Sequence, residues 1–541
     1  MASETHQPES DASRETTSAA QIVAAIDIGA TSVRMVIAQV TDDGKIEVLE
    51  KFVRAMRMGQ DTFRRGRLRA QAVRAGIGIL RDYRRVVDQY DVKHIRVVAT
   101  SSVREASNAD TFLDRVFMAT GLEVEVIDTS EESRLTVSAV REALQNVTGI
   151  KKRNALVADV GGGSTLMTVM EKGEIAASQS LRLGSIRLQE VLSTSYEPPE
   201  RSADLLRQQI SNTIKVTSGM LPLGKMQTFV AVGGDARFAA RLEGKNTSSP
   251  HLMLIKASKL DALVKRIESL NTEEIGREFS VPYSDAETIK PALLVYQGLA
   301  RATGVKDILV SDVSMRDGVI LDLARRVTGE EDPALVEGVI HSATTIAEKY
   351  HVDMNHAENV SQLSVKLFDA LSEEHRLGRR ERLLLRVGGL LHEVGGYVSN
   401  RAHHKHSYYL IVNSEIFGLS RDEHAIVAHI ARYHRRSTPK PSHTEYMALS
   451  RESRMAISKL AGILRVADAL DRGHAQQVRE FSARRRGGEL VLEIPGVSDL
   501  TLERRAVVNK GNLLEDIYGV KMRLEEASLT SQAVRRIQAV E

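Results

Sequence analysis

The sequence predicts an α/β protein in which two related lobes are followed by an all-helical domain and a small α+β module. Three observations lead to this prediction. Between Ile22 and about residue 328, short β-rich runs alternate with longer helical stretches, which is typical of an α/β region. Over residues 329–475, apolar residues recur at helical spacing and the strand signals stop. After residue 476, the β-rich runs ELVLEIPG and VKMRLEE indicate a β-containing module.

The length of 541 residues is too great for one hydrophobic core, so we expect several domains. The tail at the N-terminus is rich in Ser, Thr, Glu and Gln, and such a composition buries too little apolar surface to order the chain. The predicted boundaries are a disordered tail over residues 1–20, a first lobe over 21–150, a second lobe over 151–328, a helical domain over 329–475 and a C-terminal module over 476–541.

The composition excludes several classes of protein. The chain has no cysteine, which rules out disulfides and thiolate metal sites and agrees with a reducing compartment. No apolar run approaches the roughly 20 residues that a membrane span needs, and the polar N-terminus does not resemble a signal peptide. We therefore predict a cytoplasmic protein without membrane contact. The net charge of only +3 argues against nucleic-acid binding driven by bulk charge.

An internal repeat predicts the architecture of the first region. VAAIDIGATSVRMVIAQV and ALVADVGGGSTLMTVMEK share an apolar strand ending in Asp, a Gly-rich turn with Ser or Thr, and a second alternating strand. A P-loop or a dinucleotide-binding turn would open a helix, whereas β-rich text resumes directly after these two turns. We therefore predict a duplicated actin-like (ribonuclease H-like) fold, with the phosphates of a ligand held in the cleft between two lobes.

The glycine-rich turns are the predicted phosphate-binding elements, because glycine lets backbone N–H donors approach an anion closely and Ser or Thr adds hydroxyl donors. A single turn of this kind is usually an ordinary hairpin, but two in matched contexts favour a function. Arg34 and Arg104 each follow an apolar strand, and either binds phosphate through paired donors or is a surface arginine. The predicted phosphate-binding residues are Gly29, Thr31, Ser32, Arg34, Arg104, Gly161, Gly162, Gly163, Ser164, Thr165, Gly233 and Gly234.

Three carboxylates are the candidates for chemistry. Asp27 and Asp159 end strands that read as buried, where a charge is costly unless it binds a metal or accepts hydrogen bonds. Oxygen ligands at these positions suit Mg²⁺. Glu132 lies where a strand runs into a helix, and Thr129 with Glu132 fits a capping box, which the local pattern favours. The functional alternative is that Glu132 orients and deprotonates a water that attacks a terminal phosphorus.

Eight motifs carry a resemblance to a known family. In chain order they are DIGATSVRMVIA, VVATSSVREASN, SEESRL, VADVGGGST, LRLGSIRL, LLHEVG, HHKHSYYLI and ARYHRR. Together they resemble the exopolyphosphatase/guanosine pentaphosphate phosphohydrolase family in its long form. The resemblance implies Mg²⁺-dependent release of terminal orthophosphate from inorganic polyphosphate or guanosine pentaphosphate, by a chain that forms a homodimer. It also implies that Glu132 activates the water, that Asp159 lies in the catalytic loop, and that Arg34 and Arg104 lie at bound phosphate.

The sequence departs from the family pattern in both turns. Ala30 and Thr31 stand where the family usually has Ser and Asn, and Leu166 stands where it has Glu. Loss of one positioned acid or base group typically costs about 10² to 10⁴ in rate. Leu166 therefore predicts slow turnover, altered metal use, or a sensor that binds polyphosphate or a guanosine alarmone without hydrolysing it.

The helical region resembles the HD phosphohydrolase domain, whose histidines and carboxylates ligate one or two metal ions. The matching residues here, and thus a possible second metal site, are His356, His392, Glu393 and Asp468. Glu393 replaces an Asp of that pattern and lengthens one ligand arm, so a degenerate domain without metal is the alternative. If the domain holds metal, a third functional hypothesis is a metal-dependent nucleotide hydrolase of the HD type.

Overall fold

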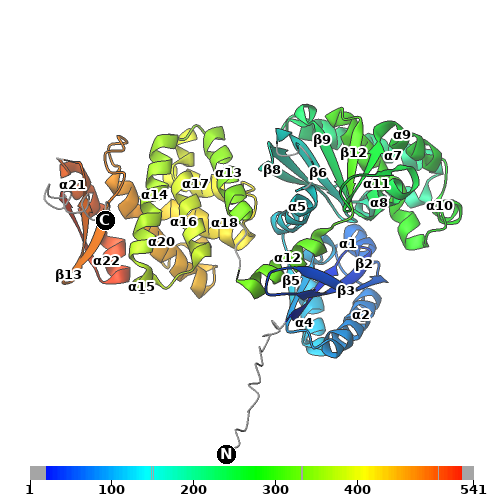
Figure 1. Cartoon of the computed structure of the whole chain (residues 1–541), viewed down its shortest axis with the longest axis horizontal. Helices are drawn as coiled ribbons and strands as arrows, with labels where there is room; N and C mark the ends of the chain where they lie inside the picture. Colours follow the sequence, from blue (N-terminus) through cyan, green and yellow to red (C-terminus); the bar gives the residue numbers. More distant parts are fainter. Residues whose placement is uncertain are drawn as a thin grey trace, which may run out of the picture.

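The computed structural model describes residues 20–145, 147, 149, 152–329, 333–435, 437–497 and 499–526. The predicted disordered tail, apart from its last residue, lies outside the described residues. Figure 1 shows two α/β lobes against each other at one end of the molecule, the helical domain beside them, and the C-terminal module at the far end. Among the described helices, none combines the length and the apolarity that a membrane span requires.

The first lobe is built on a five-stranded sheet with the order β3-β2-β1-β4-β5. β1, β2 and β3 are antiparallel, while β4 and β5 run parallel to β1. α2 and α4 cover one face, where Leu80 and Phe112 join a core with Ile26 and Met35. The elements are β1 Gln21–Ile28, β2 Ser32–Val40, β3 Ile46–Ala55, α1 Met58–Arg65, α2 Ala70–Gln89, β4 His94–Ala99, α3 Ser101–Arg104, α4 Ala109–Thr120 and β5 Val124–Val126.

The second lobe repeats this plan. Its seven-stranded sheet has the order β10-β11-β12-β9-β6-β7-β8, in which β6, β7 and β8 are antiparallel and β9 and β12 run parallel to β6. The predicted duplication is thus confirmed, with β10 and β11 as an addition at one edge. The elements are β6 Ala155–Val160, β7 Thr165–Glu171, β8 Glu174–Leu181, α6 Ser185–Leu192, α7 Pro199–Ser218, β9 Thr228–Val232, α8 Gly234–Glu243, β10 Lys245–Asn246, β11 Leu252–Lys256, α9 Ala257–Glu268, α10 Thr272–Glu278, α11 Tyr283–Thr303 and β12 Asp307–Ser311.

Two helices cross between the lobes. α5 (Thr129–Leu144) follows the first sheet but packs on the second, where Val140 contributes to a core with Val157 and Met170. α12 (Met315–Thr328) follows the second sheet but packs on the first, where Val319 contributes to a core with Val23. The two helices touch so closely that a Cβ added at Gly318 would lie 2.0 Å from the Leu135 carbonyl oxygen. This exchange fixes the two sheets relative to each other.

The helical domain is a bundle in which α14, α16, α18 and α20 pack around one another. Leucine and isoleucine at helical spacing fill its interior, including Leu363, Leu391, Ile430 and Leu464. α13 lies against β8 of the second lobe. The elements are α13 Pro333–Lys349, α14 Met354–Ala370, α15 Ser372–His375, α16 Arg379–Leu391, α17 His403–Val412, α18 Arg421–Tyr433, α19 Thr444–Met447 and α20 Arg451–Leu470.

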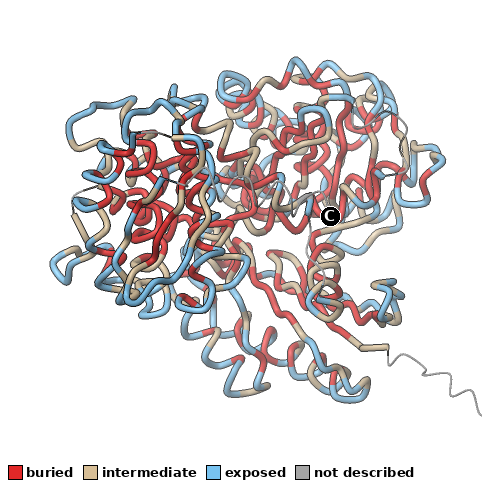
Figure 2. Tube along the Cα trace, turned by 60° about the vertical axis from the view of Figure 1, so that its left-hand side comes forward, coloured by how far each residue is buried: buried red, intermediate tan, exposed pale blue. Residues whose placement is uncertain are grey.

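The C-terminal module is the predicted small α+β unit. β13 and β14 form a hairpin, and β15 pairs parallel with β14 after two intervening helices. Val507 and Leu514 of these helices belong to the same apolar core as the helical domain, and Figure 2 shows buried backbone running through the interior of both lobes and of the helical domain. The elements are β13 Ser482–Arg486, β14 Glu489–Ile494, α21 Thr501–Lys510, α22 Asn512–Tyr518 and β15 Lys521–Glu526.

Candidate active site

A cleft of about 460 Å³ lies between the lobes and is lined by both aspartate-headed hairpins. It brings together most of the residues that the sequence predicts for phosphate binding and chemistry. These are Asp27, Gly29, Thr31, Ser32, Arg34, Glu132, Asp159, Gly161, Gly162, Gly163, Ser164, Gly233 and Gly234. The two turns therefore face the same space.

The two hairpins have the same internal geometry. In the first, the Gly29 N–H donates to the Ser32 carbonyl at 3.0 Å, and in the second the Gly161 N–H donates to the Ser164 carbonyl at 2.9 Å. Each turn directly connects two antiparallel strands, as the repeat predicts. The shared geometry places Asp27 and Asp159 at equivalent positions in the two lobes.

Glycine is required where the two turns meet. A Cβ added at Gly162 would lie 2.8 Å from the Ala30 Cβ, and one at Gly163 would lie 2.0 Å from the Ser101 Oγ. The start of α6 takes up the carbonyl oxygens of the second turn, because the Ser185 N–H donates to Gly161 at 2.9 Å and the next residues of the helix bond to Gly162. Oxygen atoms that would repel a phosphate are thus bound to α6.

Glu132 lies in the first turn of α5 and lines the cleft, although only 6% of it is exposed. The predicted capping box is wrong: the N-cap is Asp128, whose carboxylate accepts the Glu131 N–H at 2.8 Å. Glu132 is therefore free of a capping role, and its carboxylate instead accepts a hydrogen bond from Arg104 Nη1 at 2.5 Å.

The surroundings of Glu132 suit a general base. Burial raises the pKa of its carboxyl group to about 7, Arg104 opposes this rise, and the nearby carboxylates of Asp27 and Asp159 add to it. A carboxyl group with this pKa is partly ionised at neutral pH and can accept a proton there.

The two hairpin aspartates lie in an electrostatically coupled group. Burial raises the pKa of Asp159, the charge of Arg237 lowers it, and the neighbouring Asp27 raises it further. Asp27 accepts a hydrogen bond from Arg316 Nη1 at 3.3 Å. Neighbouring carboxylates favour a cation between them, and these donors are the oxygen ligands that Mg²⁺ prefers.

Two arginines of the cleft carry buried nitrogen atoms without a partner. Arg34 Nε and Arg237 Nη1 are buried, and among the described residues neither has a hydrogen-bond partner. Burial is the main cause that lowers the pKa of Arg34, and the like charge of Arg316 lowers it further. Unpaired buried donors are costly, and an anion in the cleft would pair with them.

Two predicted phosphate-binding residues lie elsewhere. Arg104 does not line the cleft, because its guanidinium binds Glu132 and the Ile127 carbonyl. The Thr165 hydroxyl is buried and donates to the Leu183 carbonyl at 2.9 Å. Arg104 therefore contacts the predicted base directly, and Thr165 supports the hairpin.

Comparison with known proteins gives a clear result. The model of the Ppx/GppA phosphatase family matches residues 36–327, and that of Ppx/GppA phosphatase, domain III, matches residues 340–509. The chain belongs to the Ppx/GppA phosphatase family. The predicted family is confirmed, and so is the predicted class of enzyme, a phosphatase.

Individual relatives agree with this assignment. The guanosine-5'-triphosphate,3'-diphosphate pyrophosphatase of Photobacterium profundum is 25% identical, over 88% of this chain and 92% of its own length. That of Vibrio parahaemolyticus is 24% identical, over 76% of this chain and 80% of its own length. The crystal structure of an exopolyphosphatase from Cytophaga hutchinsonii has a TM-score of 0.51 at 20% identity, covering 57% of this chain and 99% of the other; this likeness confirms the actin-like fold of the lobes.

Five charged cleft residues of this family member escaped the sequence analysis: Asp235, Arg237, Arg241, Asp285 and Arg316. Asp235 and Arg237 open the helix after the third glycine turn, so that turn was itself the available signal. Arg316 lies inside a capping box of Ser314 and Asp317 that directly follows β12. It thus follows the end of a strand at a short distance, as Arg104 does after β4, whereas Arg34 lies inside β2.

Proposed function

We propose that this phosphatase releases terminal orthophosphate from inorganic polyphosphate or guanosine pentaphosphate, through attack of a water activated by Glu132. The proposal rests on two features of the same cleft. The carboxyl group of Glu132 has a pKa of about 7 and provides a base for a water. Buried nitrogens of Arg34 and Arg237 have no partner among the described residues and provide donors for a chain of phosphates.

The phosphate chain would lie between the two turns. The turns at Gly29 and at Gly161 to Gly163 border the cleft from the two lobes. The N–H groups of Gly29 and Gly161 close the hairpins, so the backbone donors of the second turn are those of Gly162 and Gly163. Arg34 and Arg237 add charged donors, which form the stronger hydrogen bonds to phosphate oxygens. Binding from two lobes fixes the terminal phosphorus in position for in-line attack. Glu132 then accepts the proton of the attacking water, while Arg104 holds its carboxylate.

Asp27 and Asp159 are the proposed ligands of Mg²⁺. Their position in the cleft and their mutual electrostatic repulsion fit a cation. An ion bound there would neutralise charge on the phosphate oxygens during transfer. No covalent intermediate is required, because Glu132 alone provides the base for the attack of water.

A second candidate function rests on Leu166. This side chain is 7% exposed and lies opposite Asp159 in the hairpin, at the position where the family pattern has Glu. Because the Glu of the family pattern is absent there, the chain would bind polyphosphate or guanosine pentaphosphate tightly but turn it over slowly, and would act as a sensor.

Orthophosphate release in the presence of Mg²⁺, from long-chain polyphosphate and from guanosine pentaphosphate, tests both candidates. We expect release by the wild type and a loss of about 10²- to 10⁴-fold in kcat for Glu132→Gln, with substrate binding retained. Glu123→Gln, an exposed residue outside the cleft, is the matched control and should behave as the wild type. Unchanged activity of Glu132→Gln would refute its role, and tight binding of both substrates without release would favour the sensor.

A further inference from the structure

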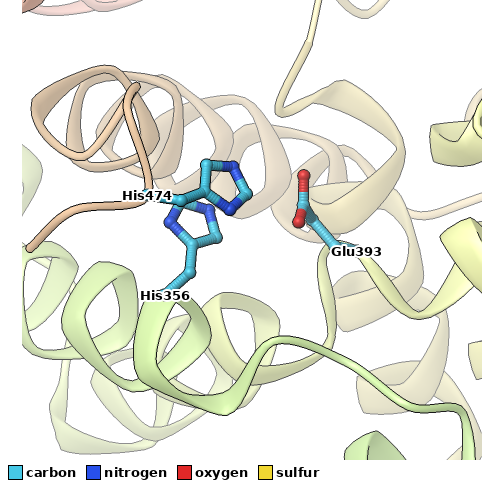
Figure 3. A group of neighbouring side chains, drawn as sticks. All are labelled: His356, Glu393 and His474. Atoms are coloured by element: carbon cyan, nitrogen blue, oxygen red, sulfur yellow. The ribbon is translucent and has the colours of Figure 1, made fainter.

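Several buried charged side chains lie outside the lining of the cleft. In the helical domain they include the residues of the predicted second metal site. His356, His392 and Asp468 each place a ligand atom within 4.8 Å of the other two, whereas Glu393 groups with His356 and His474, as Figure 3 shows. Metal binding there is implied by the resemblance to the HD domain alone and stays a prediction. Another buried charged residue, in the second lobe, belongs to neither site.

This residue is Arg187, the third residue of α6, which is only 4% exposed and does not line the cleft. Its Nε donates a hydrogen bond to the Gly163 carbonyl at 2.5 Å, and its Nη2 donates to the Glu105 carboxylate. Its Cζ atom lies 4.1 Å from the centroid of the Phe63 ring. Gly163 belongs to the second hairpin turn, whereas Glu105 and Phe63 belong to the first lobe. One side chain thus links the turn of one lobe to the other lobe.

The bond to Gly163 completes a pattern in the turn. The carbonyl oxygens of Gly161 and Gly162 accept backbone N–H groups at the start of α6, but among the described residues the Gly163 oxygen has only the Arg187 side chain as its donor. In a trans peptide the C=O and the following N–H point in opposite directions, and the described residues contain no cis peptide. The N–H groups of Gly162, Gly163 and Ser164 therefore point away from α6, and no acceptor for them is found in the described part of the chain.

The orientation of the last of these peptides, between Gly163 and Ser164, depends on Arg187. Glycine restricts the backbone least, so this peptide could turn over and present its carbonyl oxygen to the cleft. An oxygen there would repel a phosphate, whereas the Ser164 N–H attracts it, since successive backbone N–H groups form an anion-binding nest. The hydrogen bond from Arg187 selects the orientation that attracts.

The charge of Arg187 acts little on a ligand in the cleft. Its guanidinium does not line the cleft, and it is hydrogen-bonded to the Glu105 carboxylate, so the two charges largely cancel at the distance of a ligand. The arginines that do line the cleft are Arg34, Arg237, Arg241 and Arg316. The contribution of Arg187 is therefore geometric.

We infer that Arg187 is a positioning residue for the phosphate chain. It fixes the Gly163–Ser164 peptide so that the Ser164 N–H donates to a phosphate oxygen. Its contacts with Glu105 and Phe63 make this orientation depend on the position of the first lobe. The inference rests on the proposed function, because it requires that the cleft hold a chain of phosphates.

The first test compares Arg187→Ala with the wild type in orthophosphate release from inorganic polyphosphate with Mg²⁺. Loss of one hydrogen bond to a charged phosphate should raise KM by about 10- to 100-fold, with kcat changed far less. A merely structural defect would reduce the amount of folded enzyme, which lowers the apparent kcat at constant KM. Guanidinium ion at millimolar concentration should restore the KM of Arg187→Ala by occupying the emptied position, and urea, its neutral counterpart, should not.

Glu105→Gln distinguishes positioning from charge without emptying a buried position. Glu105 lies outside the lining of the cleft, so removal of its negative charge would strengthen phosphate binding if electrostatics alone mattered. We expect the opposite, a rise in KM of about 2- to 10-fold, because the guanidinium of Arg187 loses its charged partner. Arg182→Met is the matched control, since the Arg182 side chain is 80% exposed and lies 3.7 Å from the same carboxylate. It should leave KM unchanged.

An unchanged KM of folded Arg187→Ala, equal rescue by urea and guanidinium, or a lower KM of Glu105→Gln would each overturn the positioning role and leave the proposed function intact. Failure of the proposed function is recognised separately, by titration calorimetry of the wild type with inorganic tripolyphosphate. If the wild type neither binds tripolyphosphate nor releases orthophosphate, both the proposed function and the positioning role are refuted. If release persists in Glu132→Gln, only the assignment of the base is wrong.

Discussion

Leu166 pairs with Asp159 across the second hairpin at the position where Arg34 pairs with Asp27 across the first. Residues directly opposite on antiparallel strands point to the same face of the sheet. Across its own hairpin, Asp27 therefore has a cationic partner, whereas Asp159 has a buried apolar one. The repeat is symmetric in its backbone and asymmetric in its charges.

Leu166→Glu should raise the activity. The new carboxylate would lie on the face of the sheet shared by Asp159 and would add an acidic group that the family pattern has at this position. We expect kcat for orthophosphate release with Mg²⁺ to rise by about 10²-fold. This is the lower end of the rate effect that one positioned acid or base group typically has. Leu166→Gln has the same shape as Leu166→Glu without the charge and should not gain. A folded Leu166→Glu protein with no gain would show that the charge is not what limits turnover.

The pH dependence should report Glu132. The base is the ionised form, so kcat/KM should rise with pH and level off above a midpoint near 7, the pKa of this carboxyl group in the free enzyme. Arg104 lowers that pKa, so Arg104→Met should move the midpoint to higher pH. Arg115→Met, at an exposed position of α4, should leave it in place. A midpoint that moves to lower pH in Arg104→Met would contradict the assignment.

Arg34→Met should have opposite effects on stability and on binding. Without an anion, the mutation removes a guanidinium whose buried Nε has no partner among the described residues, so Tm should rise. With polyphosphate present, it removes charged hydrogen bonds that contribute about 1.5–3 kcal/mol each, so KM should increase by about 10- to 100-fold. Arg54→Met, at an exposed position of β3, should change neither quantity. A lower Tm of the free protein would show that Arg34 is already satisfied without ligand.

The hairpins could be predicted from the sequence because their signal is local. Asp, Gly and alternating apolar residues within one short segment determine the strand, the turn and the position of the aspartate. The partners of these residues could not be predicted in the same way. Arg316 bonds to Asp27 from a helix that lies 289 positions later in the chain. No local sequence pattern predicts that α12 packs on the first sheet.

The role of Glu132 could not be predicted from its local sequence. Its local text fits a capping box, and only tertiary packing shows that Asp128 takes the cap and that Glu132 faces the cleft. Arg104 was predicted from its position after a strand, but the pattern did not show that its guanidinium bonds to a carboxylate from another element. Residue type and position after a strand identified which residues lie at or near the cleft. Which charged side chains pair with each other there depends on the whole fold.

Asp128 connects the helix of the predicted base to the helical domain. Its Oδ1 accepts the Glu131 N–H at 2.8 Å as the N-cap of α5, and its Oδ2 accepts the Arg421 N–H at 2.7 Å at the start of α18. Asp128→Ala should lower the free energy of unfolding by about 0.5–2 kcal/mol, the usual cost of losing an N-cap. It should also lower kcat, because the first turn of α5 carries Glu132.

Asp128→Asn separates the two functions of this residue. The Asn side chain keeps one carbonyl oxygen, which suffices for the cap, but it cannot accept from both helices through two oxygens. We expect near wild-type kcat together with faster amide hydrogen exchange at the start of α18, where the Arg421 N–H loses its acceptor. The two functions are separated by measuring denaturant unfolding, kcat and hydrogen exchange for the wild type, Asp128→Ala and Asp128→Asn. If Asp128→Asn loses as much activity as Asp128→Ala, the contact with α18, and not the cap alone, holds Glu132 in place.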